Sequence, residues 1–352
     1  MTNSTTKSDG GPASTETNTI PLQQPRGAAR LGLSILGLGP VLILLLLAIA
    51  MSIATPLFFT ERNIQNVLLQ SSVIALLGVG QLLVILTRGI DLSVGSIIGL
   101  SSVMGGMTAT WSFANGLSVV LAIIVTGVVV GFLNGFLFVK GRIPHPFIVT
   151  LAMLSIVRGV ALTLSGGSLY TDMPPVVLWA GQGYLGPVPV PALIVAVVAG
   201  IMWFLTTRTQ WGRWIYLVGG NPEGARQVGV PVNKVLISVY VVSGLCAALA
   251  AIVSSGRTGT GDPNAGTGLE LDAIAAVIIG GASFFGGRGS VGNVIVGALT
   301  IGVIRNGLDL IGVNSFLQLI IIGVVLLLAV LLDVFRTRLE GKLRLARSEK
   351  LA

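Results

Sequence analysis

Carboxylates close to apolar segments are the first candidates for chemistry in this sequence. Glu270 and Asp272 stand two residues apart, and Asp91 and Ser93 lie in the stretch GIDLSVGS, residues 89–96. Two carboxylates can hydrolyse a glycosidic bond as general acid and base, or they can hydrogen-bond the hydroxyl groups of a polar solute. Nothing else in the sequence supports hydrolysis, and the pair lies at the start of an apolar segment.

The usual nucleophiles and metal ligands are scarce, because the chain contains one Cys and one His. Cys246 lies within an apolar run, which is typical of a small buried hydrophobic side chain. His145 lies between two prolines, and a lone imidazole forms neither a zinc site nor a catalytic triad. We therefore predict no catalytic residue, no metal and no cofactor, and we expect that the chain is not an enzyme.

The composition indicates a membrane protein. The chain is 53% hydrophobic and 10% charged, whereas soluble domains contain about 25% charged residues. Because about 20 apolar residues cross a bilayer as a helix, we predict an all-α integral membrane protein, a polytopic bundle of about ten transmembrane helices. The predicted spans are residues 31–55, 67–87, 92–112, 117–139, 147–165, 190–207, 235–254, 271–287, 290–305 and 316–332. The eighth and ninth are short and Gly-interrupted, which indicates broken or re-entrant helices.

The polar segments predict the domain organisation and the topology. Residues 1–30 have the composition of a disordered tail, residues 31–335 form the membrane domain with a polar loop at 208–234, and residues 336–352 form a basic tail. With both tails on one side, 17 of the 21 Lys and Arg residues fall on that side. The positive-inside rule therefore predicts cytoplasmic termini. The net charge of +8 then reflects topology rather than binding of nucleic acid.

The polar stretch from Gly219 to Val235 carries the start and stop signals of a small helix. These signals are an N-cap, a proline at the first helical position, an acid in the first turn and a C′ glycine, supplied by Asn221, Pro222, Glu223 and Gly229. Two helical turns are marginal alone in water. We therefore expect Ala225 and Val228 to form an apolar face that holds the helix in place.

This stretch resembles the EAA loop of ATP-binding-cassette import permeases, in which Glu-Ala-Ala is followed by a Gly four residues later. The motif here reads Glu223-Gly224-Ala225 with Gly229, and Gly224 in place of Ala loosens the helix by about 1 kcal/mol. In that family the loop is a coupling helix that docks into a groove of the ATPase subunit. The resemblance implies an ATPase-coupling role for Asn221, Glu223, Ala225, Arg226 and Gly229.

Four segments resemble the ribose-type sugar permeases, and the likeness covers about residues 35–335. They are GIDLSVGS (89–96), GGNPEGARQVGV (219–230), AGTGLELDAIAAVIIGGASFFGGRGSVG (265–292) and NGLDLIGV (306–313). The resemblance implies a homodimeric permease in the bacterial inner membrane, with a cytoplasmic ATPase subunit and an extracytoplasmic sugar-binding protein as partners. The chain contains no G-x-x-x-x-G-K-[ST] motif for binding nucleotide phosphates, which fits an ATPase on another chain.

Five polar residues are candidates for lining or gating a solute pathway: Asp91, Ser93, Asn134, Glu270 and Asp272. Each has a structural alternative. Asp91 or Ser93 can cap the next helix, and Asn134 can hydrogen-bond across helices. Glu270 and Asp272, which the topology places near the outer mouth, can receive the binding protein or act as charges at a helix N-terminus.

Two further features concern the helices themselves. Gly127, Gly131 and Gly135 are spaced by four residues and line one helix face, which favours close approach of another helix; we expect that helix to belong to the same subunit. Arg158 lies within the fifth span, where it either marks a functional site or reaches the outer end by snorkelling or by pairing with an acid.

An internal repeat is also indicated, because SVGSIIGL (93–100) is similar to SVGNVIVG (290–297). The depth and orientation of the Gly-rich elements 88–100 and 280–297 remain open at this stage. The alternative function is a self-sufficient secondary transporter of a small polar solute. Such a protein would need intramembrane acids or histidines for ion coupling, and the predicted spans carry almost none. The sequence identifies neither the sugar nor whether the ATPase is one fused chain or two.

Overall fold

The chain divides after Gly37 into two units. The computed structural model describes Thr2 and residues 39–349, with side chains described as far as Phe335. Apart from Thr2, the predicted tail 1–30 lies outside these residues, as does the first part of the predicted span 31–55. The predicted basic tail 336–352 begins within the last helix, and its side chains also lie outside the described part.

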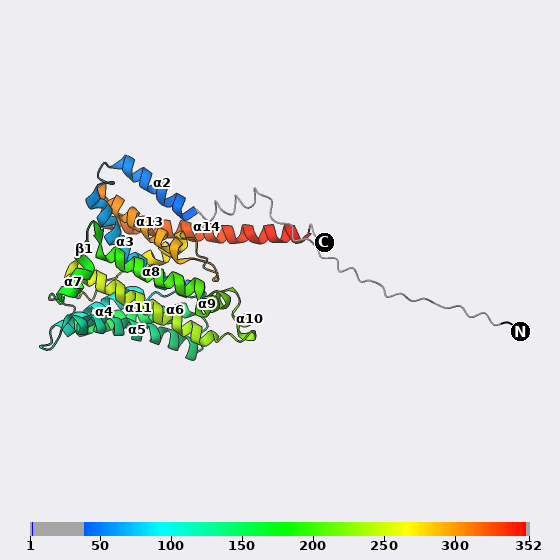
Figure 1. The fold of residues 1–352 in the computed structure, drawn as a ribbon, viewed down its shortest axis with the longest axis horizontal. Helices are drawn as coiled ribbons and strands as arrows, with labels where there is room; N and C mark the ends of the chain where they lie inside the picture. Colours follow the sequence, from blue (N-terminus) through cyan, green and yellow to red (C-terminus); the bar gives the residue numbers. More distant parts are fainter. Residues whose placement is uncertain (1, 3–38, 350–352) are drawn as a thin grey trace. The chain divides into compact units, whose positions relative to one another are not determined.

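The described chain is almost entirely helical, as Figure 1 shows. The one sheet among the described residues is a hairpin of two short antiparallel strands, β1 (Tyr184–Leu185) and β2 (Val188–Pro189). The helices are α2 (Gly39–Ala54), α3 (Glu61–Leu86), α4 (Val94–Ala109), α5 (Gly116–Lys140), α6 (Pro146–Ser165), α7 (Pro175–Gln182), α8 (Val190–Arg208), α9 (Gln210–Gly220), α10 (Pro222–Gln227), α11 (Val232–Thr258), α12 (Leu269–Ile279), α13 (Val291–Leu310) and α14 (Ser315–Glu349).

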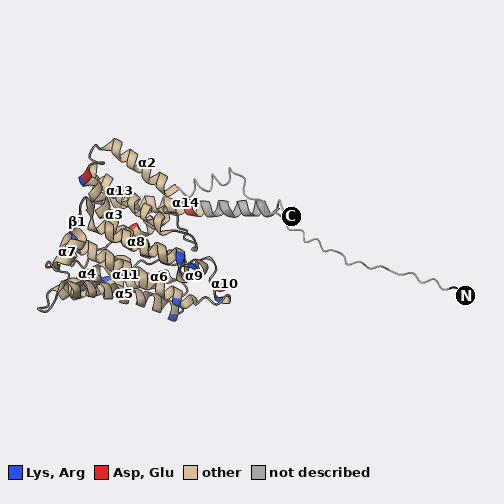
Figure 2. Cartoon of the chain, in the orientation of Figure 1, with Lys and Arg blue, Asp and Glu red and all other residues tan. Residues whose placement is uncertain are grey.

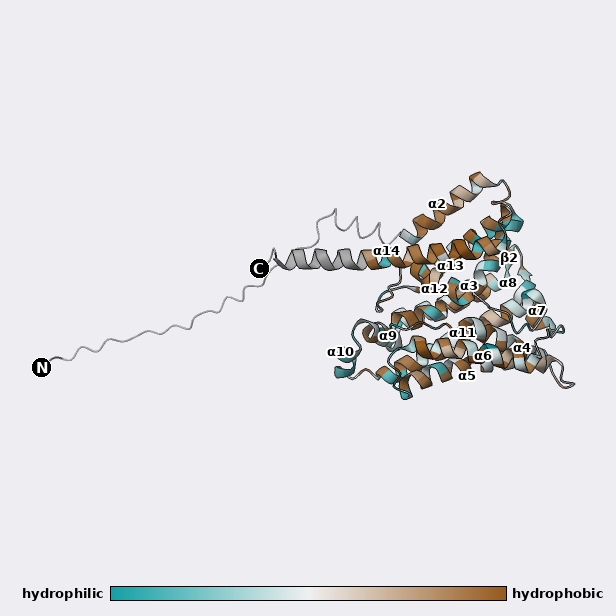
Figure 3. Ribbon diagram, turned by 180° about the vertical axis from the view of Figure 1, so that it is seen from behind, coloured by the Kyte–Doolittle hydropathy of each residue, from teal (hydrophilic) through white to brown (hydrophobic). Residues whose placement is uncertain are grey.

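Seven helices of the described chain are long and apolar enough to cross a membrane: α3, α5, α6, α8, α11, α13 and the part of α14 from Ser315 to Phe335. Lys and Arg residues gather near the end of the bundle where α9 and α10 lie (Figure 2), which we call the α10 end. Apolar residues cover the long helices, whereas α10 is hydrophilic (Figure 3). The all-α membrane fold is thus as predicted, with seven long apolar helices where the sequence predicts about ten spans.

The three shorter apolar elements account for the difference. Helix α4 has 16 residues and α12 has 11, too few for the roughly 20 residues that cross a bilayer. The 16 residues of α2 begin where the description of the predicted span 31–55 begins, so they set no upper limit to the length of that span. The predicted span 271–287 therefore contains the short helix α12 followed by a Gly-rich turn, in agreement with the broken helix that its glycines predict. The predicted break in 290–305 is wrong, because α13 is one continuous helix of 20 residues.

Helix α3 is the centre of the bundle. Its residues from Ser71 to Leu86 are buried on every side, as expected for a helix that is apolar all round. It contacts α11, α13, α12 and α8. Large apolar side chains on α5, α6, α8 and α14 are exposed, so these helices provide the surfaces that face lipid or another subunit.

Helices α5 and α11 approach each other closely enough for their backbones to touch. A Cβ atom built on Gly127 would collide with Gly244 O, and one on Gly131 would collide with Tyr240 O. A Cβ on Gly135 would lie 2.8 Å from the Cα of Ile237. The glycine stripe of α5 therefore packs on α11 of the same chain, as predicted, and small residues allow this separation.

Replacement of Gly131 by Leu is expected to destabilise the protein by about 1–3 kcal/mol or more, since the added side chain overlaps the α11 backbone. The measurement is the apparent unfolding temperature of the detergent-solubilised chain. Gly159→Leu on α6 is the matched control, because no atom lies within 4 Å of a Cβ built there. Equal unfolding temperatures for the two variants would contradict the close α5–α11 contact.

Candidate functional site

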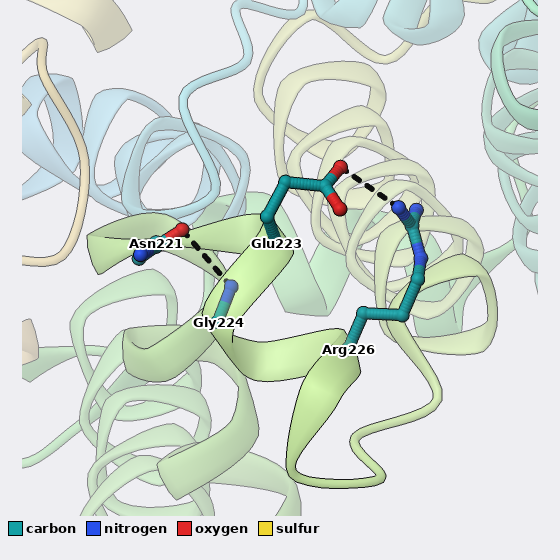
Figure 4. A network of polar contacts seen from close by, with 4 residues as sticks. All are labelled: Asn221, Glu223, Gly224 and Arg226. Atoms are coloured by element: carbon teal, nitrogen blue, oxygen red, sulfur yellow. Dashed lines mark hydrogen bonds and ion pairs between the residues drawn. The ribbon is translucent and has the colours of Figure 1, made fainter.

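The predicted coupling segment forms a short helix that is capped at both ends. Asn221 Oδ1 accepts a hydrogen bond from Gly224 N at 3.0 Å (Figure 4), so Asn221 is the N-cap. At the other end Gly229 has φ +81°, with Gly229 N donating to Arg226 O and Val230 N donating to Ala225 O. These two bonds form a Schellman motif, and both ends of α10 are as predicted.

The surface of α10 is mostly polar and exposed. Glu223 and Arg226 form an ion pair of 2.8 Å with both side chains largely in solvent, a contact that adds little stability. Ala225 is 4% exposed and faces the rest of the chain, whereas Val228 is 74% exposed. The expectation that both apolar residues hold the helix is therefore wrong for Val228, which follows the last turn and points outward.

The helix α9, directly before α10, was not predicted from the polar loop 208–234. Thr209 Oγ1 accepts a hydrogen bond from Gly212 N at 3.2 Å and caps it, while Ile215 and Val218 are buried. Trp211 Nε1 donates to Ser238 Oγ on α11 at 2.8 Å. The segment 208–234 is thus a helical hairpin fixed to α11, with α10 at its tip.

Three of the five pathway candidates meet in one buried cluster. Asp91 Oδ1 accepts hydrogen bonds from Ser93 N at 3.0 Å and Ser93 Oγ at 2.7 Å, and Asn134 Nδ2 donates to Ser93 Oγ at 2.7 Å. Ser243 Oγ of α11 donates to Asp91 Oδ2 at 3.0 Å. All four residues are at most 1% exposed. We call Asp91, Ser93, Asn134 and Ser243 the Asp91 cluster.

Two neighbours complete the surroundings of the Asp91 cluster. The Gln81 amide of α3, oriented to satisfy both of its polar atoms, bonds Asp91 O and Asp91 N at 3.1 Å each. Tyr240 Oη and Asn134 Oδ1 are buried without a hydrogen-bond partner among the described residues. Sequence reasoning missed Gln81 and Ser243; the available signal was a polar side chain within an apolar span.

The structural alternative for this turn was that Asp91 or Ser93 caps the next helix, α4. Ser93 is the N-cap residue of α4 but its side chain makes no capping bond; instead Asp91 accepts the Ser93 N–H. At the corresponding place in the other half, Ser290 Oγ accepts a hydrogen bond from Asn293 N at 3.3 Å and caps α13. The two similar segments, 93–100 and 290–297, therefore both begin a helix.

Arg158 holds a non-helical segment inside the bundle. After α11 ends at Gly259, which has φ +72°, residues 259–268 run alongside α4. Arg158 Nη1 donates to Pro263 O and to Ala265 O, and Ser102 Oγ donates to Asp262 O at 2.9 Å. Backbone away from water needs such partners, and these side chains supply them.

Glu270 and Asp272 take separate partners. The Glu270 carboxylate lies against Gly95 in the first turn of α4, whereas Asp272, 1% exposed, forms an ion pair of 2.6 Å with Arg305 of α13. The two carboxylates therefore have different neighbours and do not share a partner, and their position near the outer mouth stays a prediction.

Residues 63–330 match the family described as the permease component of the branched-chain amino acid transport system. The chain belongs to this permease family. Among curated proteins, this permease is 42% identical to the ribose import permease protein of Escherichia coli (strain K12) over 297 residues, which are 83% of this chain and 92% of that protein.

Other relatives are named for different sugars. The permease is 41% identical to the D-allose transport system permease protein of Escherichia coli (strain K12), over 83% of this chain and 89% of that protein. It is 37% identical to the fructose import permease protein of Rhizobium meliloti, over 84% of each chain. No solved structure matches the chain.

Replacement of Asp91 by Ala is expected to lower the stability of the permease. The change leaves Ser93 N and Ser243 Oγ buried without an acceptor, at a cost of about 1–3 kcal/mol for each unsatisfied group. The measurement is the apparent unfolding temperature in detergent, with the exposed Asp172→Ala as control. An Asp91→Ala permease that unfolds at the native temperature would show that the cluster contributes nothing to stability.

Replacement of Arg158 by Lys is expected to loosen residues 259–268. Both bonds come from Arg158 Nη1, and the ammonium group of Lys keeps the charge but, on its flexible stem, not the fixed planar geometry that directs this nitrogen at the two carbonyl oxygens. Hydrogen–deuterium exchange of a peptide covering 259–268 should become faster, and exchange in α13 should not change. Arg62→Lys, at an exposed position, is the control; equal exchange in both variants would exclude the proposed support.

Proposed function

We propose that this permease is the membrane subunit of an ATP-driven importer that moves a monosaccharide delivered by an extracytoplasmic binding protein. The observation that carries the proposal is α10, a rigidly capped helix at the tip of the α9–α10 hairpin that presents Glu223, Arg226 and Val228 to solvent. A helix this short is not stable alone. The caps at both ends and the attachment of α9 to α11 hold α10 in place. A helix held in this way is able to pass movement from a separate ATPase to the membrane helices.

The relatives support a sugar as the transported solute. They are named for ribose, allose and fructose, so the class is a pentose or a hexose, and the binding protein selects among them. The permease itself breaks no bond in the sugar. Transport instead depends on a shift between the populations of the inward-facing and outward-facing states of the permease.

The topology follows from the charges. The α10 end is the cytoplasmic face, because basic residues gather there (Figure 2), and both termini lie on that side of the bacterial inner membrane. The seven long helices together with α2, α4 and α12 would make ten membrane segments, of which α4 and α12 are short. Two copies would form a homodimer, with the exposed apolar side chains supplying its interface.

The opposite end would receive the binding protein. Segments 166–189 and 256–272 are the candidates for this contact, and they are joined there by an isolated bridge between Tyr170 and Gly261. The pathway candidates lie further in. The route would be gated by Asp91, Ser93 and Asn134 through a change of hydrogen-bond partners. Two buried groups beside them, Asn134 Oδ1 and Tyr240 Oη, have no partner among the described residues and are available for new hydrogen bonds. Glu270 and Asp272, at the N-terminus of α12, would line it.

Replacement of Glu223 by Lys is expected to weaken binding of the ATPase, because it places two cations on α10 and a positive charge at the positive end of a helix. The permease is co-expressed with the ATPase and binding protein encoded beside its gene, purified by a C-terminal tag, and assayed for bound ATPase and ATP hydrolysis. Glu61→Lys is the matched control, since Glu61 is an exposed acid in the first turn of α3, at the opposite end of the bundle.

The proposal requires that the ATPase co-purifies with the native chain and with Glu61→Lys, and is lost or reduced with Glu223→Lys. A native chain that purifies alone and moves solute into vesicles without ATP would instead establish the secondary transporter.

A further inference from the structure

The turn that ends α3 contains a residue in an unusual conformation. Arg88 N donates to Ile85 O and Gly89 N donates to Val84 O, each at 2.9 Å, which is the Schellman pattern. Arg88 therefore occupies the C′ position and has φ +66°. This left-handed conformation favours Gly, and a side chain there is strained.

The corresponding position after α10 has the favoured residue. There the same hydrogen-bond pattern has Gly229 at C′, with φ +81°. An arginine at C′ of α3 has a conformational cost that a glycine would avoid. Strained backbone of this kind persists where the surrounding structure holds it in place, often at functional sites. The strain therefore points to a role for the Arg88 side chain.

The Arg88 side chain is bonded to the end of α9. Its Nε donates to Gly219 O at 2.6 Å, and its Nη2 donates to Gly220 O. These carbonyls belong to the last turn of α9 and have no partner within that helix. A guanidinium group satisfies both of them at once and complements the negative end of the helix dipole.

Close backbone contacts surround this pair of hydrogen bonds. A Cβ built on Gly219 would collide with Leu86 O, and Gly287 N donates to the same Leu86 O at 2.9 Å. The end of α3, the end of α9 and the turn at Gly286–Gly287 therefore meet at one point. We call this meeting point the Arg88 junction.

The Arg88 junction lies between the two candidate functional regions. Gly220 is followed directly by Asn221, the N-cap of α10, and Arg88 is three residues before Asp91. We infer that Arg88 is the positioning residue that transmits movement of α10 to the α3–α4 turn, and through it to the Asp91 cluster. The inference rests on the proposed function of α10 as the contact with the ATPase.

The test uses the full complex of permease, ATPase and binding protein in lipid vesicles, with D-ribose, D-allose and D-fructose as the solutes tried. Arg88→Gly removes the guanidinium and places the favoured residue at φ +66°. Arg88→Lys keeps the charge without the planar fork. Arg213→Ala on α9 is the matched control, since Arg213 is exposed and the hydrogen bond that its backbone N–H donates to Thr209 O does not involve the side chain.

The Arg88→Gly permease is expected to bind the ATPase as the native chain does and to unfold at the same or a higher temperature. Sugar uptake per ATP hydrolysed should fall at least about fivefold, a usual size for a coupling between two sites. Arg88→Lys should lie between Arg88→Gly and the native chain, and Arg213→Ala should match the native chain.

Three results would overturn the inference. Uptake per ATP at the native level in Arg88→Gly would show that movement passes elsewhere. Loss of ATPase binding would place Arg88 in the docking surface, and loss of folded permease would make it a structural anchor. Failure of the native chain to bind any ATPase is a different outcome, because it contradicts the proposed function itself.

Discussion

The close contact between α5 and α11 is the constraint on which the central part of this structure depends. Because Gly127, Gly131 and Gly135 place no side chain between the two helices, the backbone of α11 lies directly on α5. That separation brings Asn134 from α5 and Ser243 from α11 to the same turn, where both join the hydrogen bonds around Asp91. A wider spacing would separate Ser243 from Asn134 and leave Asp91 Oδ2 without its donor, which is expensive for a buried carboxylate in an apolar surrounding.

Buried polar groups also need hydrogen-bond partners in the non-helical segment between α11 and α12. Residues 259–268 leave helical geometry inside the bundle, so their carbonyl groups need donors from elsewhere in the chain. Arg158 and Ser102 supply them. Arg158 thus supplies hydrogen-bond donors to a distant backbone segment from within an apolar helix, and Arg305 pairs with one oxygen, Oδ2, of the Asp272 carboxylate.

The sequence predicts local features of this permease well and long-range partners poorly. Capping at Asn221 and Gly229, the packing face of α5 and the apolar character of the spans each depend on a few neighbouring residues, and each was predicted. The partners of Arg158, Asp272 and Arg88 lie far away along the chain. No spacing rule connects them, and Val228 was misassigned because its exposure depends on how the whole hairpin is held.

The brevity of α12 has a consequence for how the chain is built into the membrane. With 11 residues, α12 is too short to enter lipid as an independent helix during synthesis, and it carries Asp272, whose charge opposes entry into hydrocarbon. Its cationic partner belongs to α13, which is synthesised later. Burial of Asp272 away from water therefore becomes favourable only once α13 places Arg305 beside it, so α12 reaches its final position together with α13 and not before it.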